Sequence, residues 1–331
     1  MAKALSITLS CGKRMAYQKW STSAPKKGRV VCSHGWLDNS NSFSYLGPML
    51  ASQGYEVIAI DWLGHGYSDH IEGSYIIIII IITIIYLFIE GMLYNFASNV
   101  SNLYSFLHEV QWTTDTNILG HSMGAGISLL FAGCFPSMVK NLILIDGFGP
   151  ITAEPVRSTA LLTKAIEEEN TFYKNNIKGK KIYENIKKAI ENRIRSVSSY
   201  PGNQSISREA AISLVSRGTK ILDNDDNNED IDENNSNNVV FRHDPRLFLP
   251  SYSYFSNDQI LNFVENITAK TLLIQGSSGW PVGSNDIIQR KQILESKNLL
   301  EHNILPGSHH LHLDPLSREK VGETIMTFLD K

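Results

Sequence analysis

The chain has 331 residues, 42% of them hydrophobic and 19% charged, with a formal net charge of −3. This length suits one domain with an insertion better than two independent domains. The composition is ordinary for a soluble globular protein, and the small charge argues against nucleic acid or an anionic membrane as a partner. The few, widely spaced cysteines (Cys11, Cys32 and Cys134) argue against a disulfide framework and favour the cytoplasm. Residues 1–20 alternate like a strand, so we expect no secretory signal.

Apolar runs of strand length predict eight strands. Most runs are near-continuous, as in 142–145 (LILI), which is typical of strands buried in a parallel sheet. The first two runs have no helix between them and suit an antiparallel start, whereas the others alternate with helical patterns. We therefore predict an α/β fold with an eight-stranded, mostly parallel sheet. The strands are expected near 4–10, 14–20, 28–33, 55–61, 116–121, 141–146, 271–275 and 301–305. The helices are expected near 43–53, 95–110, 123–134, 286–298 and 316–330.

An Ile-rich run at 75–89 interrupts this pattern after the fourth strand. It is about 15 residues long, short of the roughly 20 that span a bilayer. A spanning segment here would pull the sheet apart, so we expect no stable membrane span. Three interpretations of the atypical insertion 75–93 stay open: a translated intron or other gene-model artefact, a buried β-rich insertion, and a membrane contact. The monotonous repeat favours the artefact.

A second departure lies between the sixth and seventh strands, where 150–250 reads as mostly helical and charged. We expect it to form a helical cap over the site. Four isoleucines spaced four apart predict one apolar helix face: Ile182, Ile186, Ile190 and Ile194. That face is expected to pack on its own domain, with a membrane-surface helix as the alternative. The acidic, Asn-rich tract 222–238 has nothing to bury and is expected to be a disordered loop.

The pentapeptide 120–124 (GHSMG) lies between a buried strand and a helical pattern, with Ser122 at its centre. A strand, a tight turn and a helix with serine at the apex are typical of the nucleophile elbow of α/β-hydrolases. Both glycines suit a strained turn in which strand and helix backbones nearly touch. The pentapeptide alone is weak, because three fixed positions recur by chance. Its flanks make Ser122 the candidate nucleophile.

A serine nucleophile needs a base, and in this fold the order along the chain is serine, acid, histidine. His309 follows the last predicted strand and precedes the last helix, so it should lie above the carboxyl ends of the parallel strands. We expect His309 to be the base. His310 and His312 remain competitors.

The acid that orients the histidine is less clear from the sequence. These hydrolases most often place it three residues beyond a glycine after the seventh strand, and here that position is Gly279. The alternative placement is the end of the sixth strand, where Asp146 stands. Asp146 is therefore the candidate acid, and its competing interpretation is a turn aspartate that caps the loop. Asp286 is the outside candidate.

An acyl-transfer intermediate also needs donors for its oxyanion. In this fold they are the backbone N–H after the nucleophile and one from the loop after the third strand. The corresponding residues are Met123 and Trp36, the latter within Ser33-His34-Gly35-Trp36.

Metal and cofactor chemistry are the rivals to this interpretation. His310, His312 and Asp314 resemble the start of a metal-ligand set, but almost no further ligands follow them. No phosphate-binding Gly-rich motif is present. We predict neither a metal nor a cofactor.

The chain resembles the serine hydrolase-like branch of the α/β-hydrolase superfamily. The matching phrases run in the family's order and cover nearly the whole chain apart from 71–93 and 222–238. They are 34–40 (HGWLDNS), 61–68 (DWLGHGYS), 120–126 (GHSMGAG), 146–150 (DGFGP), 241–247 (FRHDPRL) and 306–310 (PGSHH). The resemblance implies a cap-bearing hydrolase without a cofactor, with Ser122 and His309 in the catalytic positions. Some members are associated with cytoplasmic vesicles or peroxisomes, which is the alternative location.

Together these patterns predict an α/β-hydrolase domain formed by 1–149 and 251–331, with a cap at 150–250. The predicted activity is cleavage of an ester, thioester or similar acyl bond of a small, largely apolar substrate through an acyl-enzyme. Ser122, His309 and Asp146 would act on it, with Trp36 and Met123 as oxyanion donors. The alternative is a catalytically impaired relative that binds a small ligand, which Gly279 favours. The substrate itself and the oligomeric state cannot be read from the sequence.

Overall fold

The structure is a computed structural model that describes residues 2–71, 94–175, 181–202, 204–222, 229–280 and 283–331. The Ile-rich insertion at 75–93 lies outside these residues. The strands of the main sheet are β1 (Lys3–Thr8), β2 (Arg14–Trp20), β3 (Gly28–Ser33), β4 (Tyr55–Ile60), β5 (Thr116–His121), β6 (Val139–Ile145), β10 (Lys270–Ser278) and β11 (Leu300–Ser308). They lie in the order β1-β2-β4-β3-β5-β6-β10-β11. β2 is antiparallel to both its neighbours, and all other neighbours are parallel. The predicted α/β fold and its eight-stranded, mostly parallel sheet are confirmed.

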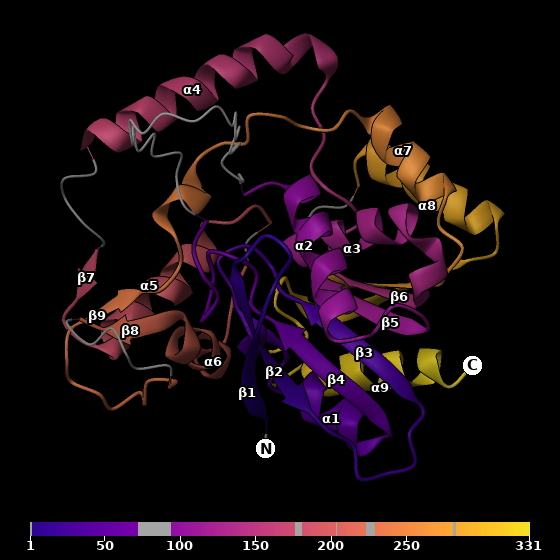
Figure 1. Cartoon of the computed structure of the whole chain (residues 1–331), viewed down its shortest axis with the longest axis horizontal. Coiled ribbons are helices and arrows are strands. Elements are labelled where there is room, and N and C mark those ends of the chain that lie inside the picture. The colour runs from indigo at the N-terminus through magenta and orange to yellow at the C-terminus, as the bar shows by residue number, and fades with distance from the viewer. Residues whose placement is uncertain (1, 72–93, 176–180, 203, 223–228, 281–282) are drawn as a thin grey trace, which may run out of the picture.

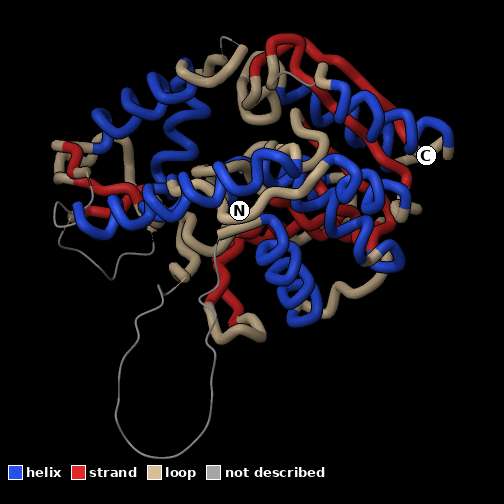
Figure 2. Tube along the Cα trace, turned by 90° about the horizontal axis from the view of Figure 1, so that it is seen from above, coloured by secondary structure: helices blue, strands red, loops and turns tan. Residues whose placement is uncertain are grey.

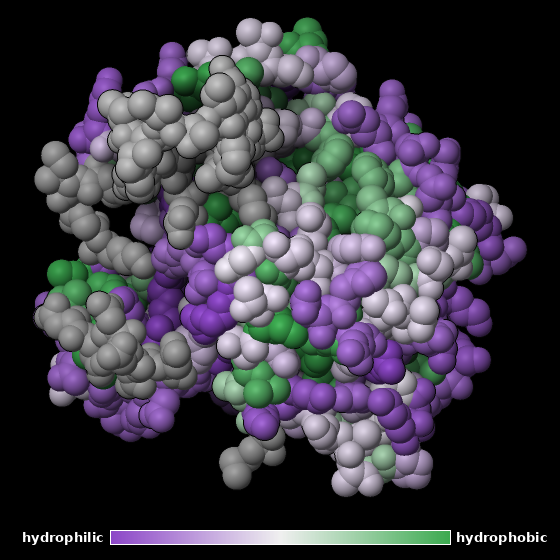
Figure 3. All heavy atoms as spheres, viewed as in Figure 1, coloured by the Kyte–Doolittle hydropathy of each residue, from purple (hydrophilic) through white to green (hydrophobic). Residues whose placement is uncertain are grey.

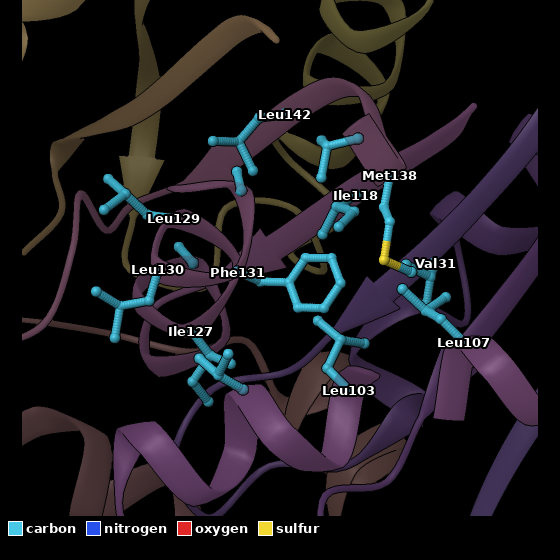
Figure 4. Close-up of a cluster of buried hydrophobic side chains, with 14 of the residues drawn as sticks. Val31, Leu103, Leu107, Ile118, Ile127, Leu129, Leu130, Phe131, Met138 and Leu142 are labelled. Carbon is cyan, nitrogen blue, oxygen red and sulfur yellow. The ribbon is translucent and has the colours of Figure 1, made fainter. Parts of the chain in front are cut away.

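Helices cover both faces of this sheet (Figure 1). They are α1 (Leu46–Ser52), α2 (Phe96–Glu109), α3 (Met123–Cys134), α7 (Asn257–Glu265), α8 (Asn285–Ser296) and α9 (Arg318–Leu329). Alternate residues of one strand face different layers: Leu142 and Leu144 pack with α2, α3 and α7, whereas Ile143 and Ile145 pack with α1 and α9. Figure 4 shows the first layer around Phe131 of α3. Burying a side chain of this size contributes roughly 1.5–3 kcal/mol to stability. Because helices cover both faces of the sheet, successive residues of a strand are all buried, which explains the continuous apolar runs.

The insertion between β6 and β10 has its own small core. It contains α4 (Ser158–Asn175), α5 (Ile186–Ser198), α6 (Arg208–Gly218), β7 (Ile182–Tyr183), β8 (Thr219–Ile221) and β9 (Val239–Phe241). The three strands form an antiparallel sheet in the order β7-β9-β8, which the sequence did not predict. This sheet, α5 and α6 lie beside the main sheet, and α4 runs across the top of the molecule (Figures 1 and 2). The function of this segment as a cap stays a prediction.

The isoleucine stripe is shorter than the sequence indicated. Ile186 and Ile190 of α5 are fully buried in the core of the insertion, and Ile194 is partly buried against it. Ile182 belongs to β7 rather than to the helix and is 54% exposed. Most of the stripe therefore packs in the core of the insertion to which it belongs, as expected. None of the helices in the described parts of the chain combines the length and apolar character that crossing a bilayer requires.

The Asn-rich tract differs in part from its expected character. Residues 223–228 lie outside the described residues. In the second half, however, Ile231 is buried in the core of the insertion. The neighbouring Asp230 accepts hydrogen bonds from the Tyr67 hydroxyl and the Asn41 amide, both at 2.7 Å. The expectation that this tract has nothing to bury is therefore wrong for these residues.

A buried ion pair joins the insertion to the main sheet. Arg217 of α6 donates from Nε and a terminal nitrogen to Asp61, at 3.1 and 2.8 Å to Oδ2. Asp61 follows β4 and also accepts the backbone N–H groups of Ser40 and Tyr67. Burial alone would raise the pKa of Asp61, but Arg217 outweighs it and leaves that pKa below its ordinary value. Loss of either partner would leave the other charge buried without compensation, so the pair strongly constrains how the insertion sits.

Candidate active site

Ser122 lies at the apex of the turn between β5 and α3, where the backbone is strained. Its φ of 54° and ψ of −117° are a conformation that non-glycine residues rarely adopt. A Cβ added to Gly124 would lie 2.2 Å from the Ser33 carbonyl oxygen, and one added to Gly120 would lie 2.6 Å from the Gly124 oxygen. Both glycines are thus required by the close approach of strand and helix. The turn exposes the serine hydroxyl at the carboxyl edge of the sheet, as the motif predicted.

The structure brings Ser122 together with His309 and Asp146. His309 Nε2 lies 2.9 Å from Ser122 Oγ, and His309 Nδ1 lies 2.6 Å from Asp146 Oδ2. His309 follows the end of β11 and Asp146 follows the end of β6, so parallel strands deliver both side chains to one edge. The residue His309 is 4% exposed and the residue Asp146 1% exposed. This is the geometry of a nucleophile, a base and an orienting acid.

Asp146 occupies the space that an acid at position 279 would need. Its Oδ1 accepts the Gly276 N–H at 2.9 Å, and its Oδ2 accepts the Trp280 N–H at 2.6 Å. A Cβ added to Gly279 would lie only 2.0 Å from Asp146 Oδ1. The two placements of the acid therefore exclude each other in this chain. This gives a steric reason why no carboxylate stands at the position where the sequence pattern first places one.

The competing residues have other partners. His310 Nε2 lies 3.3 Å from Asp38 Oδ2, and His312 Nε2 lies 2.8 Å from the Ser42 hydroxyl. Asp286 accepts a hydrogen bond from Thr152 Oγ1 at 2.5 Å and lies 3.9 Å from Arg290. Within the described residues, none of the three contacts Ser122 through a hydrogen bond.

The two expected oxyanion donors belong to residues that line one cavity. Met123 is the first residue of α3, and Trp36 lies in the loop after β3; both line the cavity that contains Ser122. Neither backbone N–H donates a hydrogen bond to any described residue. The Trp36 indole donates to the Leu247 carbonyl at 3.0 Å, and its ring packs edge-on against Phe248. The Trp36 loop is thus held from the insertion side, with its N–H group available to a ligand.

A second buried charged cluster lies behind the triad, and sequence reasoning missed it. Asp38 pairs with Arg193 of α5 and contacts His310, and His121 Nδ1 lies 3.7 Å from it. Burial alone would raise the pKa of Asp38, yet Arg193 and His310 hold it well below its ordinary value. Burial lowers the pKa of His121 and His310 and so favours their neutral forms. The only sequence signal was Asp38 within the family phrase at 34–40.

Ser122 opens into a cavity of about 810 Å³. Much of its wall is hydrophobic, including Trp36, Phe96, Phe148, Phe255, Trp280 and Ile287. Viewed from the side, hydrophobic side chains gather around a hollow between α2 and α7 (Figure 3). Ile151, Thr152 and Tyr200 from the insertion also line it, as do the charged side chains of Asp286 and Arg290. A cavity of this size and character fits a small, largely apolar molecule.

Among the described residues, no group of three His, Cys, Asp or Glu side chains is arranged to hold a metal ion.

Comparison with known proteins agrees with this geometry. The family described as the alpha/beta hydrolase fold matches residues 28–316. A serine hydrolase-like protein of Dictyostelium discoideum is 29% identical over 95% of this chain and 78% of its own length. A serine hydrolase-like protein of Danio rerio is 28% identical over 92% of this chain and 82% of its own length.

One solved structure extends the similarity to three dimensions. A hypothetical protein of Pseudomonas aeruginosa PAO1 is 29% identical, with a TM-score of 0.79 over 100% of this chain and 99% of that one. The resemblance inferred from the motifs is thereby confirmed. The chain belongs to the alpha/beta hydrolase fold family and is similar over nearly its whole length to the two serine hydrolase-like proteins above.

Proposed function

We propose that this protein is a serine hydrolase that cleaves an ester, thioester or similar acyl bond of a small, largely apolar substrate. The observation that carries the proposal is the hydrogen-bonded series Ser122–His309–Asp146 at the mouth of an apolar cavity. Both hydrogen bonds are within the range that proton transfer and orientation require. The cytoplasmic location stays a prediction.

The mechanism follows from these positions. Ser122 Oγ attacks the substrate carbonyl carbon while His309 Nε2 takes the hydroxyl proton. Asp146 accepts the Nδ1–H of His309, which fixes the tautomer and stabilises the imidazolium that forms. The N–H groups of Trp36 and Met123 donate to the oxyanion, and the N-terminus of α3 adds its positive dipole.

The intermediate then collapses to an acyl-enzyme. The bond between the carbonyl carbon and the leaving group breaks, and His309 gives its proton to the departing oxygen or sulfur. Water repeats the sequence: His309 takes a proton from the water, the hydroxyl adds to the acyl carbon, and the proton returns to Ser122 Oγ as the acid leaves. No step needs a group beyond those in the site and water.

The alternative of a ligand-binding protein that lost catalysis was favoured by Gly279. The position of Asp146 argues against it, because its carboxylate fills the space beside Gly279 and lies 2.6 Å from His309 Nδ1. An intact set of nucleophile, base and acid supports the hydrolase over the binding protein.

Hydrolysis of p-nitrophenyl esters of graded acyl length tests the proposal. Each methylene that becomes buried in the cavity contributes up to about 0.8 kcal/mol, or roughly fourfold in kcat/KM. We expect kcat/KM to rise from acetyl towards medium-length acyl groups and to vanish in Ser122→Ala. Activity that survives in Ser122→Ala, or a folded wild-type protein inert on every ester, would overturn the proposed reaction.

A further inference from the structure

Gln204 is a buried side chain that the mechanism above does not use. It lies between α5 and α6 of the insertion and is 2% exposed. Its Oε1 accepts the His309 backbone N–H at 2.8 Å and the Ser308 hydroxyl at 2.7 Å. Its Nε2 donates to the Gly279 and Pro201 carbonyls, both at 2.9 Å. All four hydrogen-bonding positions of the amide are thus occupied. Two carbonyl groups face Nε2 and a backbone N–H faces Oε1, and these partners fix which end of the amide carries the oxygen.

The two ends of this amide hold the backbone of His309 and the loop that contacts Asp146. Oε1 binds the backbone of His309 itself. Nε2 binds Gly279, whose neighbour Trp280 donates its N–H to Asp146 at 2.6 Å. On the other side, His121 Nε2 donates to the His309 carbonyl at 2.9 Å. The backbone of the base is therefore held by Gln204 from the insertion and by His121 from the nucleophile turn.

The sheet alone does not supply this restraint. β10 and β11 pair regularly as far as Gly276 and Leu305, and the register then shifts before the last pair, Ser278 and Ser308. His309 lies one residue beyond that pair. Its imidazole must nevertheless stay 2.9 Å from Ser122 Oγ and 2.6 Å from Asp146 Oδ2. A misplacement of about 1 Å at such a site can cost on the order of 100-fold in rate.

We propose that Gln204 is a positioning residue through which the insertion sets the geometry of His309 and Asp146. The insertion then contributes to the chemical step as well as to the cavity wall. This inference rests on the proposed hydrolase function.

The test uses the full-length protein, with Gln204→Ala compared with Gln204→Glu and with Val239→Ala as a matched control. Val239 is fully buried in the core of the insertion and is distant in sequence from the triad loops, so its truncation disturbs the same module. Three measurements are made: the rate constant for labelling by a small alkyl fluorophosphonate, kcat and KM for p-nitrophenyl acetate, and thermal unfolding.

We expect Gln204→Ala to lower the labelling rate and kcat by about 10- to 100-fold, with KM changed less than about twofold. Gln204→Glu keeps the acceptor for the His309 N–H but places a carboxylate oxygen against the Gly279 and Pro201 carbonyls in place of the N–H donors, so its rates should also fall below those of the wild type. Val239→Ala should label within about twofold of the wild type. The low-field proton resonance of the His309–Asp146 hydrogen bond should weaken in Gln204→Ala and persist in Val239→Ala.

A folded Gln204→Ala protein with wild-type labelling and kcat would overturn this role, as would an equal loss in Val239→Ala. If Gln204→Ala does not fold, Gln204→Met replaces it, because methionine has a similar length but keeps none of the four amide hydrogen bonds. A wild-type rate in folded Gln204→Met would then overturn the role. A wild-type protein that is not labelled would overturn the hydrolase function and this role together, whereas a labelled wild type with unaffected variants overturns the role alone.

Discussion

A double variant, Asp146→Gly with Gly279→Asp, would move the triad carboxylate from residue 146 to residue 279 while leaving the total side-chain volume at the site unchanged. A Cβ on Gly279 would lie 2.0 Å from Asp146 Oδ1 and 2.6 Å from its Cγ, so a carboxylate grown from it must use the space that Asp146 now fills. Asp146 has a φ of 46°, which glycine adopts without strain. The double variant Asp146→Gly with Gly279→Asp is therefore sterically compatible with the fold.

The expected magnitudes follow from the role of the acid. Without a carboxylate, His309 loses the acceptor that fixes its tautomer, and kcat should fall by roughly 10⁴, or about 5.4 kcal/mol in the barrier. In the double variant a carboxylate returns beside His309 Nδ1. We expect at least about 100-fold recovery over Asp146→Gly, short of the wild-type rate because the new carboxylate approaches from a different backbone position.

The assay is kcat for p-nitrophenyl acetate hydrolysis, with circular dichroism to show that each variant is folded. Gly279→Asp alone is the matched control, since it places a second carboxylate against Asp146 and should lose both activity and stability. A folded double variant no faster than Asp146→Gly would refute the reasoning. So would a wild-type rate in Asp146→Gly.

Three further predictions concern stability. Arg217→Ala leaves Asp61 buried without its partner and should lower the free energy of unfolding, measured in urea, by about 3–5 kcal/mol. Arg208→Ala, which breaks an exposed pair with Glu233, should lower it by less than about 1 kcal/mol. Equal losses in the two variants would contradict the role of burial. Gly124→Ala places a Cβ 2.2 Å from the Ser33 oxygen and should lower the free energy of unfolding by about 3 kcal/mol or more. In the control Gly283→Ala the new Cβ meets no atom within 4 Å, and the free energy of unfolding should change by less than about 1 kcal/mol. A Gly124→Ala protein as stable as the wild type would contradict the steric requirement at this turn. Burial lowers the pKa of His312 from 6.5 to about 3, so below pH 6.5 the unfolded chain binds a proton that the folded protein does not. The free energy of unfolding should therefore fall as the pH drops from 6.5 towards 3, by up to about 1.4 kcal/mol per pH unit from this residue. Urea titrations between pH 6.5 and 4.5 should show a smaller slope in His312→Asn than in the wild type. The same slope in both proteins would contradict this role of His312.

Much of the fold could be predicted because buried strands contain continuous apolar runs, as in β6, where all four residues of the run 142–145 (LILI) are buried. α7 was missed although its start carries a capping box, in which Ser256 and Gln259 cap each other's backbone. The small sheet of the insertion left no signal, because strands of two or three residues are too short to show a period.

The site could be predicted only as far as local sequence defines it. Ser122 lies in a motif, and His309 and Asp146 lie at the ends of predictable strands. Gln204 and the pair of Asp38 with Arg193 depend on how the insertion sits on the sheet, across 105 and 155 residues of sequence. Such contacts have no local pattern. The absence of an acid at Gly279, ambiguous in the sequence, acquires a steric reason only once Asp146 is placed beside it.

The most direct test of the central claim is the mass of the folded protein after exposure to a fluorophosphonate, followed by peptide mapping. A serine activated by His309 and Asp146 should take up one phosphonyl group, located on the peptide that contains Ser122. Ser122→Ala and heat-unfolded protein should take up none. A folded wild-type protein that stays unmodified, or that is modified at another residue, would contradict the assignment of Ser122 as a nucleophile.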